Sequence, residues 1–202
     1  MVFGLPEKNR FVLASRSPRR QQLLKEAGFE FAVRVIDYDE EIPSGMNGRE
    51  IAEHLSRRKA SYFDSQRPGE NEIIITADTI VWCDGKVLDK PVTHDDAMAL
   101  LRLISAKTHE VITAVSLVSS GRIHTFSETT RVTFTDISEE EIAYYVENFR
   151  PFDKAGGYGI QEWIGVTANS RIEGSYFNVM GLPVQRLIRE LREFIRQAEN
   201  LP

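Results

Sequence analysis

The feature that most constrains the fold of this 202-residue chain is a strongly apolar run at residues 73–82, which reads IIITADTIVW. Such a run is typical of a strand that is buried on both faces, as in the interior of an α/β sheet. Asp78 and Thr79 interrupt it. A carboxylate at this position is costly unless it is paired, hydrogen-bonded or bound to a metal ion. The sequence therefore leaves two interpretations of Asp78: a capped or salt-bridged structural residue, or, as we favour, a metal ligand or general base.

A second apolar segment, at residues 11–14, leads directly into hydroxyl and guanidinium side chains. Ser17 suits the N-cap of a helix, and Pro18 suits its first position because the missing N–H costs nothing there. Free N–H groups and a partial positive charge at a helix N-terminus attract anions. Three arginines lie next to this terminus: Arg16, Arg19 and Arg20. The pattern predicts a phosphate-binding site, although a solvated basic surface would have the same sequence.

The order of the remaining segments predicts an α/β fold. Further strands are expected at residues 29–36, 86–88, 108–118, 123–134 and 176–179. Helices are expected at residues 18–27, 48–63, 95–104 and 138–148, and from residue 183 onward. Strands that alternate with helices are typical of the α/β class, and the length fits a single domain over residues 1–202.

Composition narrows the classes of function. The formal net charge of −5 argues against nucleic acid as the main partner, so any basic cluster is local. Cys83 is the single cysteine, which excludes an internal disulfide and a cysteine-rich zinc site. We expect this thiol to be buried. The sequence contains no segment long and apolar enough to span a membrane, and its first ten residues lack the apolar core of a signal peptide. The expected location is the cytoplasm.

Other charged residues are candidates for a site. Lys59 lies beside the apolar stripe of its helix, and Lys90 follows the strand at 86–88. Residues 153–161 place Lys154 beside three glycines, which allow close approach of backbone to a ligand. His109, at the entry of a strand, is expected to be structural.

Four carboxylates occur within five residues, after the strand at 29–36. They are Asp37, Asp39, Glu40 and Glu41. Oxygen ligands of this kind could hold a hard divalent cation. A solvated acidic loop would have the same composition, and the sequence does not separate the two interpretations.

Several motifs, in order, resemble those of the Maf family of nucleoside triphosphate pyrophosphatases. They are LASRSPRR at 13–20, KA at 59–60, ADT at 77–79, KP at 90–91, THEV at 108–111, DKAGGYGIQ at 153–161 and NVMGLP at 178–183. The resemblance implies an elongated mixed β-sheet with flanking helices, two lobes around a central cleft, and a homodimer. It also implies hydrolysis of a nucleoside triphosphate to the monophosphate and pyrophosphate, assisted by a divalent cation, Mg²⁺ or Mn²⁺.

The resemblance also assigns expected roles. Asp78 would be the proton acceptor, Lys59, Lys90 and Arg19 would handle phosphate charge, and Thr79 and Gln161 would help to choose the base. Further substrate contacts are expected from Ser15, Arg20 and Lys154, and metal contacts from Asp78 and Glu40. The GIQ sequence at 159–161 resembles the branch of the family that acts on dTTP and UTP.

Two residues depart from the family pattern, in which glycine is usual at both positions: Ala106 and Glu162. The first is expected to alter only a turn. Glu162 follows Gln161, and because adjacent side chains of an extended segment point to opposite sides, we expect it to point away from the base.

Alternative functions remain at this point. A carboxylate in the base pocket would instead favour 7-methyl-GTP, whose ring carries positive charge. A non-catalytic nucleotide-binding regulator of septum formation would need an apolar or strongly charged partner surface. An enzyme that transfers phosphate would more often contain a Walker loop, which this chain lacks.

Overall fold

A seven-stranded mixed sheet forms the frame of the protein in the computed structural model, which describes residues 5–6, 8–36, 43–66, 68–119 and 121–199. The order along the sheet is β2-β1-β3-β5-β6-β7, and β4 pairs with β3. The strands are β1 (Arg10–Leu13), β2 (Phe31–Val33), β3 (Glu72–Cys83), β4 (Lys86–Leu88), β5 (Thr108–Ser119), β6 (Arg122–Phe134) and β7 (Asn169–Glu173). β1 is parallel to β2 and β3, whereas the other pairs are antiparallel. The predicted α/β class with a mixed sheet is confirmed.

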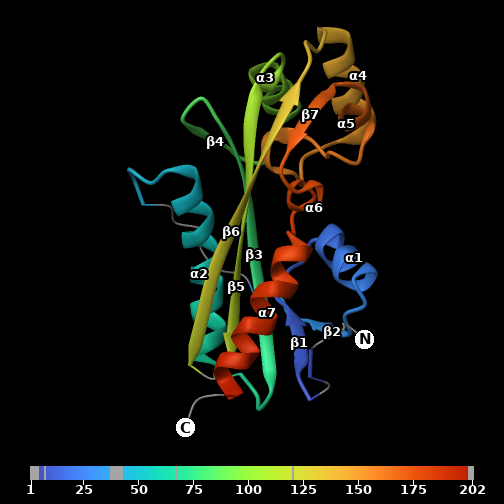
Figure 1. Cartoon of the computed structure of the whole chain (residues 1–202). Helices are drawn as coiled ribbons and strands as arrows, with labels where there is room; N and C mark the ends of the chain where they lie inside the picture. The colour runs from blue at the N-terminus through green and yellow to red at the C-terminus, as the bar shows by residue number, and fades with distance from the viewer. Residues whose placement is uncertain (1–4, 7, 37–42, 67, 120, 200–202) are drawn as a thin grey trace.

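Three long neighbouring strands, β3, β5 and β6, give the molecule its elongated shape (Figure 1). Each has at least 12 residues, which at roughly 3.3 Å per residue spans about 40 Å. The apolar run at 73–82 lies within β3 and is largely buried, as predicted, apart from half-buried positions that include Asp78 and Thr79.

The helices are α1 (Pro18–Glu26), α2 (Gly48–Ser65), α3 (His94–Ile104), α4 (Glu139–Phe149), α5 (Trp163–Thr167), α6 (Tyr176–Val179) and α7 (Val184–Glu199). In Figure 1, α2 and α7 run alongside the lower part of these strands, whereas α3, α4 and α5 gather at their upper end. One lobe contains β1, β2, α1 and α7, and the other contains β4, β7, α3, α4 and α5, with α6 between them. We call these the first and second lobes. Among the described residues, no helix is long and apolar enough to cross a membrane.

Side chains of β3 alternate between two cores. Ile73 and Ile75 belong to the largest apolar cluster, which includes residues of α1 and α7. Ile74 and Ile80 instead pack with residues of α2 on the opposite face. This period of two is expected of a strand covered on both faces. It presents the side chains of Asp78 and Thr79 on different faces, so the two can meet different neighbours.

The side of β3 that faces β1 is open in its middle. β1 pairs with β3 from Glu72 to Ile75, and β4 pairs with it from Val81 to Cys83. Among the described residues, no strand pairs with residues 76–80 on this side. Asp78 therefore lies at the centre of a gap in the sheet, at the junction of the two lobes.

Helix starts follow the local sequence signals. Ser17 caps α1 with Pro18 at its first turn, as predicted. Thr93 with Asp96, and Ser138 with Glu141, form reciprocal capping boxes for α3 and α4. In each box the side chains satisfy N–H groups that the helix leaves unpaired.

Several predicted boundaries were wrong. The segment Tyr176–Val179 is one turn of helix, α6, and not a strand, because Ser175 accepts a hydrogen bond from the Asn178 N–H and caps it. A short apolar run cannot by itself distinguish the two. The strand expected at 29–36 is limited to Phe31–Val33. The sequence analysis also missed α5 and the edge strand β7.

Ala106 adopts a left-handed backbone conformation with φ of 55°. It lies in the turn between α3 and β5, where its N–H donates to the Thr135 carbonyl at 3.0 Å. Glycine reaches this conformation without steric cost, which explains why glycine suits the position. The expectation that this departure affects only a turn is consistent with its location.

Two side chains expected to be structural are buried, as predicted. Cys83 is 2% exposed and His109 is 1% exposed. His109 Nε2 is 2.7 Å from the Tyr158 hydroxyl, and its ring packs edge-on against Phe134. Burial lowers the pKa of His109 to about 4. The ring is therefore neutral in the folded protein at pH 7.

This burial predicts a loss of stability in mild acid. Between pH 6.5 and 4 the unfolded chain binds a proton at His109 that the folded chain does not, so the free energy of unfolding falls as the pH falls. We expect this residue to contribute a loss of about 3 kcal/mol across that window. Urea unfolding of wild type and His109→Gln at several pH values should show this loss. The free energy of unfolding of wild type should fall relative to that of His109→Gln as the pH falls from 6.5 to 4. His94→Gln, at a half-exposed position, is the control, and a pH-independent difference for His109→Gln would contradict the prediction.

Candidate active site

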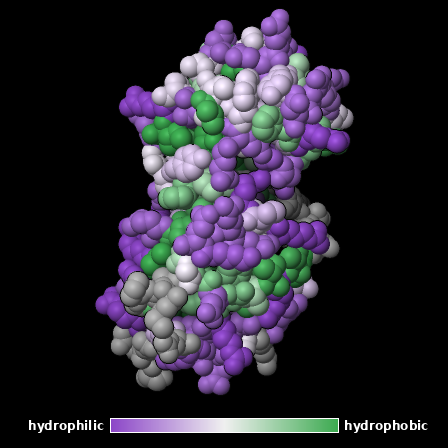
Figure 2. Space-filling view, turned by 90° about the vertical axis from the view of Figure 1, so that its right-hand side faces the viewer, coloured by the Kyte–Doolittle hydropathy of each residue, from purple (hydrophilic) through white to green (hydrophobic). Residues whose placement is uncertain are grey.

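A cavity of about 150 Å³ lies at the gap in β3, between the two lobes. It joins a hollow of about 400 Å³ beside the loop that follows β1. Predicted site residues that line the cavity are Arg19, Arg20, Lys59, Asp78, Thr79, Lys90, Lys154 and Gln161, and Ser15 lines the adjoining hollow. We call the two spaces together the cleft. Figure 2 shows hydrophilic residues gathered at the waist between the lobes.

Asp78 and Lys59 form an ion pair at the floor of the cleft. Lys59 Nζ, from α2, donates to Asp78 Oδ2, and the Thr79 N–H donates to Asp78 Oδ1 at 3.0 Å. The two side chains are only 15% and 16% exposed. The pair offsets the cost of a partly buried carboxylate, so Asp78 is salt-bridged and also faces the cavity. The two interpretations of this residue are therefore compatible.

The first lobe supplies the arginine-rich wall. Ser17 N–H donates to Ser15 Oγ at 3.2 Å, which orders the loop before α1. Arg19 NH1 donates to Asp153 Oδ2 at 2.9 Å, and Asp153 belongs to the loop after α4 in the second lobe. This ion pair joins the two lobes across the cleft. Arg20 also lines the cavity, but its guanidinium group donates hydrogen bonds to the protein.

The glycine-rich loop, residues 153–161, forms the opposite wall of the cleft, which we call the second wall. Gly156 has φ of 70°, and a Cβ atom there would lie 2.9 Å from Val81 Cγ2, so glycine allows the loop to approach β3. Lys154 is 9% exposed and its Nζ lies 2.7 Å from Asp153 Oδ1 and 3.0 Å from Glu162 Oε1. Burial acts to raise the pKa of Asp153, but hydrogen bonds from Lys154 and Arg19 outweigh it and hold this pKa below its ordinary value.

Glu162 also lines the cavity, together with Gln161. The expectation that it points away was wrong, because residues 160 and 161 form a turn and Glu162 is the N-cap of α5, so the alternation of an extended strand does not apply. Its Oε2 accepts a hydrogen bond from the Tyr145 hydroxyl. That hydroxyl in turn accepts from the Gly159 N–H at 2.9 Å.

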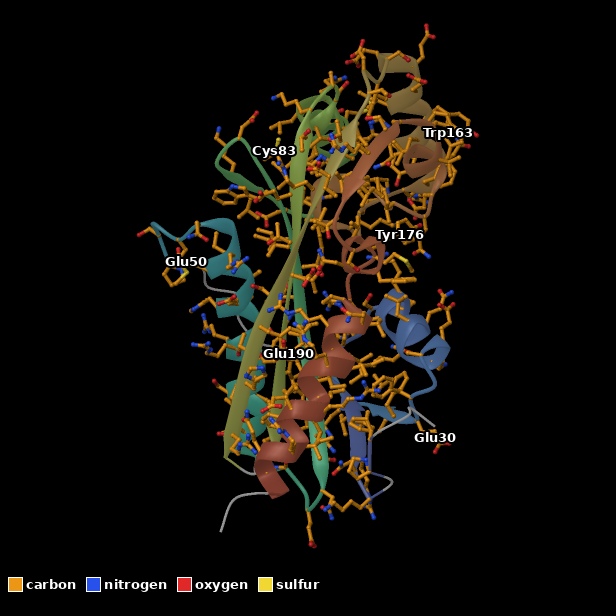
Figure 3. All side chains as sticks on the ribbon, in the orientation of Figure 1. Glu30, Glu50, Cys83, Trp163, Tyr176 and Glu190 are labelled. Atoms are coloured by element: carbon orange, nitrogen blue, oxygen red, sulfur yellow. The ribbon has the colours of Figure 1, made fainter. Side chains whose placement is uncertain are left out.

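Tyr145 is a residue that sequence reasoning missed. Tyr145 lies in the apolar stripe of α4, and this position predicts only a core residue. The side chain is fully buried. Burial raises the pKa of its hydroxyl, and the hydrogen bond to Glu162 raises it further. The group therefore stays protonated and donates to the carboxylate. In Figure 3, Trp163 marks α5, which Glu162 caps, in the second lobe, while Tyr176 marks α6 at the waist.

The charges of the cavity differ from those of the whole chain. Five basic and three acidic side chains line it, a formal net charge of +2 in a chain of net charge −5. The acidic residues are Asp78, Asp153 and Glu162, each in contact with a basic side chain. Such a concentration of cations favours a polyanion.

A metal site remains a prediction. In the part of the chain that the structure describes, no group of three or more acidic, histidine or cysteine side chains could hold a metal ion. Glu40, with the rest of the predicted acidic segment 37–41, lies outside the described residues. Mg²⁺ is commonly held by one or two carboxylates together with phosphate oxygens and water. Asp78, half-buried and facing the cavity, is a donor of this kind.

Comparisons with known proteins identify the family of this chain. A sequence model of the family described as Maf-like protein matches residues 10–194. A dTTP/UTP pyrophosphatase of Bacteroides fragilis is 47% identical over 188 residues, which cover 93% of this chain and 97% of the relative. A dTTP/UTP pyrophosphatase of Phocaeicola vulgatus is 49% identical over 189 residues, with coverage of 93% and 97%. Among solved structures, the Staphylococcus aureus Ham1 protein matches with a TM-score of 0.48 and 14% identity, covering 94% of this chain and 100% of that chain.

The Tyr145 hydroxyl provides a test of the second wall. Tyr145→Phe removes the donor to Glu162 and the acceptor of the Gly159 N–H, so we expect the free energy of unfolding to fall by about 1–3 kcal/mol. Urea unfolding measures it. Tyr144→Phe, half-exposed on the same helix, is the control and should change the value by less than about 0.5 kcal/mol. Equal stability of the two variants would show that the hydroxyl does not hold this wall.

Proposed function

This chain belongs to the Maf-like protein family, and we propose that its cleft hydrolyses dTTP and UTP to the monophosphates and pyrophosphate. The observation that carries the proposal is a cavity of net charge +2, with the Asp78 carboxylate at its floor, in an acidic chain. A triphosphate supplies the complementary negative charge. The relatives named for this activity cover nearly the whole chain.

The reaction requires water to attack the α-phosphorus. A bond forms between the water oxygen and phosphorus, and the bond to the oxygen that bridges the α- and β-phosphates breaks, its electron pair leaving with pyrophosphate. Asp78 accepts the proton of the attacking water. Lys59, Lys90 and Arg19 line the cleft and offset the charge that develops on the departing group. In this proposal the Lys59–Asp78 contact keeps a cation beside the proton acceptor.

A divalent cation, Mg²⁺ or Mn²⁺, is part of the proposal. Asp78 and Glu40 would hold it, and it would neutralise phosphate charge when bound. Asp78 supports this part of the proposal, because its carboxylate faces the cavity and can share a metal ion with substrate oxygens.

Base selection is assigned to the second wall. Gln161 offers both an N–H donor and a carbonyl acceptor, which match the N3–H and carbonyl groups of thymine or uracil. Glu162 is the feature that could favour the cationic base of 7-methyl-GTP. Its carboxylate, however, already contacts Lys154 at 3.0 Å and accepts from Tyr145, so its charge is compensated within the protein. This pairing supports the pyrimidine substrates.

A homodimer in the cytoplasm completes the proposal. The family resemblance supports the dimer, and the single buried cysteine suits a reducing compartment. Sedimentation equilibrium of the purified chain tests the dimer independently of its activity.

The decisive assay follows both product and base. We expect Mg²⁺-dependent release of pyrophosphate, and not orthophosphate, with the highest kcat/KM for dTTP and UTP among dTTP, UTP, CTP, GTP and 7-methyl-GTP. An intact diphosphate leaving group is what the cluster of cations stabilises. Orthophosphate as the first product would contradict attack at the α-phosphorus, and preference for 7-methyl-GTP would assign base selection to Glu162.

Asp78→Asn tests the proton acceptor. The amide is nearly isosteric but cannot accept the proton, so we expect kcat to fall by about 10²–10⁴-fold with the fold retained. Asp84→Asn is the matched control, since Asp84 lies at an exposed turn and pairs with Lys107 at 2.6 Å, and it should retain full turnover. If Asp78→Asn kept more than half of the wild-type rate, Asp78 would have only a structural role.

A further inference from the structure

Arg20 is tied to the protein by an unusually complete set of hydrogen bonds. Nε donates to the Gly181 carbonyl at 2.8 Å, and NH1 donates to the Ala77 carbonyl at 2.8 Å and to Ser15 Oγ at 3.2 Å. NH2 donates to Thr79 Oγ1 at 2.9 Å. Four of the five N–H bonds of the guanidinium group are therefore directed at the protein.

The acceptors lie on three separate segments. Ala77 and Thr79 flank Asp78 in β3, Ser15 belongs to the loop between β1 and α1, and Gly181 lies between α6 and α7. Gly181 has φ of 111°, a conformation that L side chains rarely adopt. Its backbone approaches closely enough that a Cβ atom would lie 3.6 Å from both Arg20 Nε and Thr79 Oγ1.

Arg20 takes the place of a missing strand. The Ile75 carbonyl of β3 accepts from the Ala14 N–H at 2.8 Å, just past the end of β1. Two residues further along, the Ala77 carbonyl points to the same side of β3, where β1 no longer runs. The Arg20 guanidinium supplies the donor there. It thereby satisfies an edge carbonyl that the gap in the sheet would otherwise leave unpaired.

Arg20 also fixes Thr79. The Thr79 hydroxyl is 2.9 Å from Thr113 Oγ1, which donates to the Asn178 carbonyl at 3.1 Å. This chain of hydroxyls connects Arg20 to β5 and α6. Because the N–H of Thr79 donates to Asp78, a shift of Thr79 would move the carboxylate.

We propose that Arg20 is a positioning residue that braces β3 at Asp78, and that it is not a phosphate ligand. This reverses the role predicted for it from the sequence. Arg19, its neighbour, also lines the cleft but has a different partner, because it points across the cleft to Asp153. Consecutive residues of a helix lie about 100° apart, so the two arginines face different surroundings.

The planar guanidinium group holds several N–H donors in fixed directions, which makes this role specific to arginine. A lysine offers one ammonium group and cannot reach acceptors on three segments at once. Arg20→Lys keeps the charge and should still lose the brace, whereas a phosphate-binding role would tolerate lysine better.

The first experiment is independent of turnover. A double-mutant cycle of Arg20→Lys and Thr79→Val, followed by thermal unfolding, should show that the two losses in Tm are less than additive. We expect Arg20→Lys alone to lower Tm by about 4 °C, the order expected for a lost, partly buried hydrogen bond in a chain of this size. Arg19→Lys is the control and should leave Tm nearly unchanged. Strict additivity, or an unchanged Tm for Arg20→Lys, would overturn the brace even if the chain hydrolyses dTTP as proposed.

The second experiment rests on the proposed function. Calorimetry with a non-hydrolysable α,β-imido analogue of dTTP measures binding. We expect the Kd of Arg20→Lys to lie within about 3-fold of wild type. For Arg19→Ala we expect the Kd to rise about 10-fold, which corresponds to a lost charge-assisted contact of about 1.4 kcal/mol. The kcat of Arg20→Lys on dTTP should fall by at least about 10-fold, since misplacement of a catalytic group slows the chemical step.

Chemical rescue completes the test. In Arg20→Ala, or in Arg20→Lys if the alanine variant does not fold, 20 mM guanidinium chloride should raise kcat and Tm relative to 20 mM sodium chloride, because the ion can occupy the same acceptors. Wild type and Arg19→Ala should show no such gain in Tm. If loss of Arg20 weakens binding of the analogue as strongly as loss of Arg19 does, while Tm stays constant, then Arg20 is a phosphate ligand. If the analogue does not bind wild type at all, the proposed function fails, and the brace is decided by the double-mutant cycle.

Discussion

The ion pair between Lys59 and Asp78 is the interaction on which the rest of the structure depends. A carboxylate in the middle of a central strand would cost several kcal/mol without a partner. The partner comes from α2, so this helix must lie flat against β3 with its lysine at the level of the gap in the sheet. Cores on both faces of β3 then form around a fixed charged centre, and the two lobes meet at that point.

The gap itself follows from unequal strand lengths. The pairing of β1 with β3 ends at Ile75, and the antiparallel β4 ends at Leu88, opposite Val81, so neither covers the middle of the 12-residue β3. A sheet with full-length neighbours would have no room for a cleft there. Neighbouring groups compensate for the missing strand. Arg20 donates to a backbone carbonyl of the open edge, and Lys59 neutralises Asp78. The glycine-rich loop forms the opposite wall of the cleft.

Local signals made much of this predictable from the sequence. The apolar run of β3, the N-cap at Ser17 and the capping boxes depend on neighbours within a few residues, and the family motifs assembled around one cavity as expected. The errors arose where distant contacts decide the outcome. Glu162 turns inward because it accepts a hydrogen bond from Tyr145 and pairs with Lys154. The role that we propose for Arg20, which lines the cavity, likewise depends on the carbonyls of Ala77 and Gly181, each more than 50 residues away in the sequence. Periodicity carries no information about such partners.

The Arg19–Asp153 pair gives the cleft a built-in competitor. An anion that takes Arg19 must displace a carboxylate already 2.9 Å from it, and Asp153 then retains only its contact with Lys154. The same carboxylate is available to reclaim the guanidinium group when the anion departs. Entry of a highly charged ligand at Arg19 would thus be an exchange of counter-ions, which lowers the net affinity at this position. The bridge between the lobes is therefore also a contact that such a ligand must open.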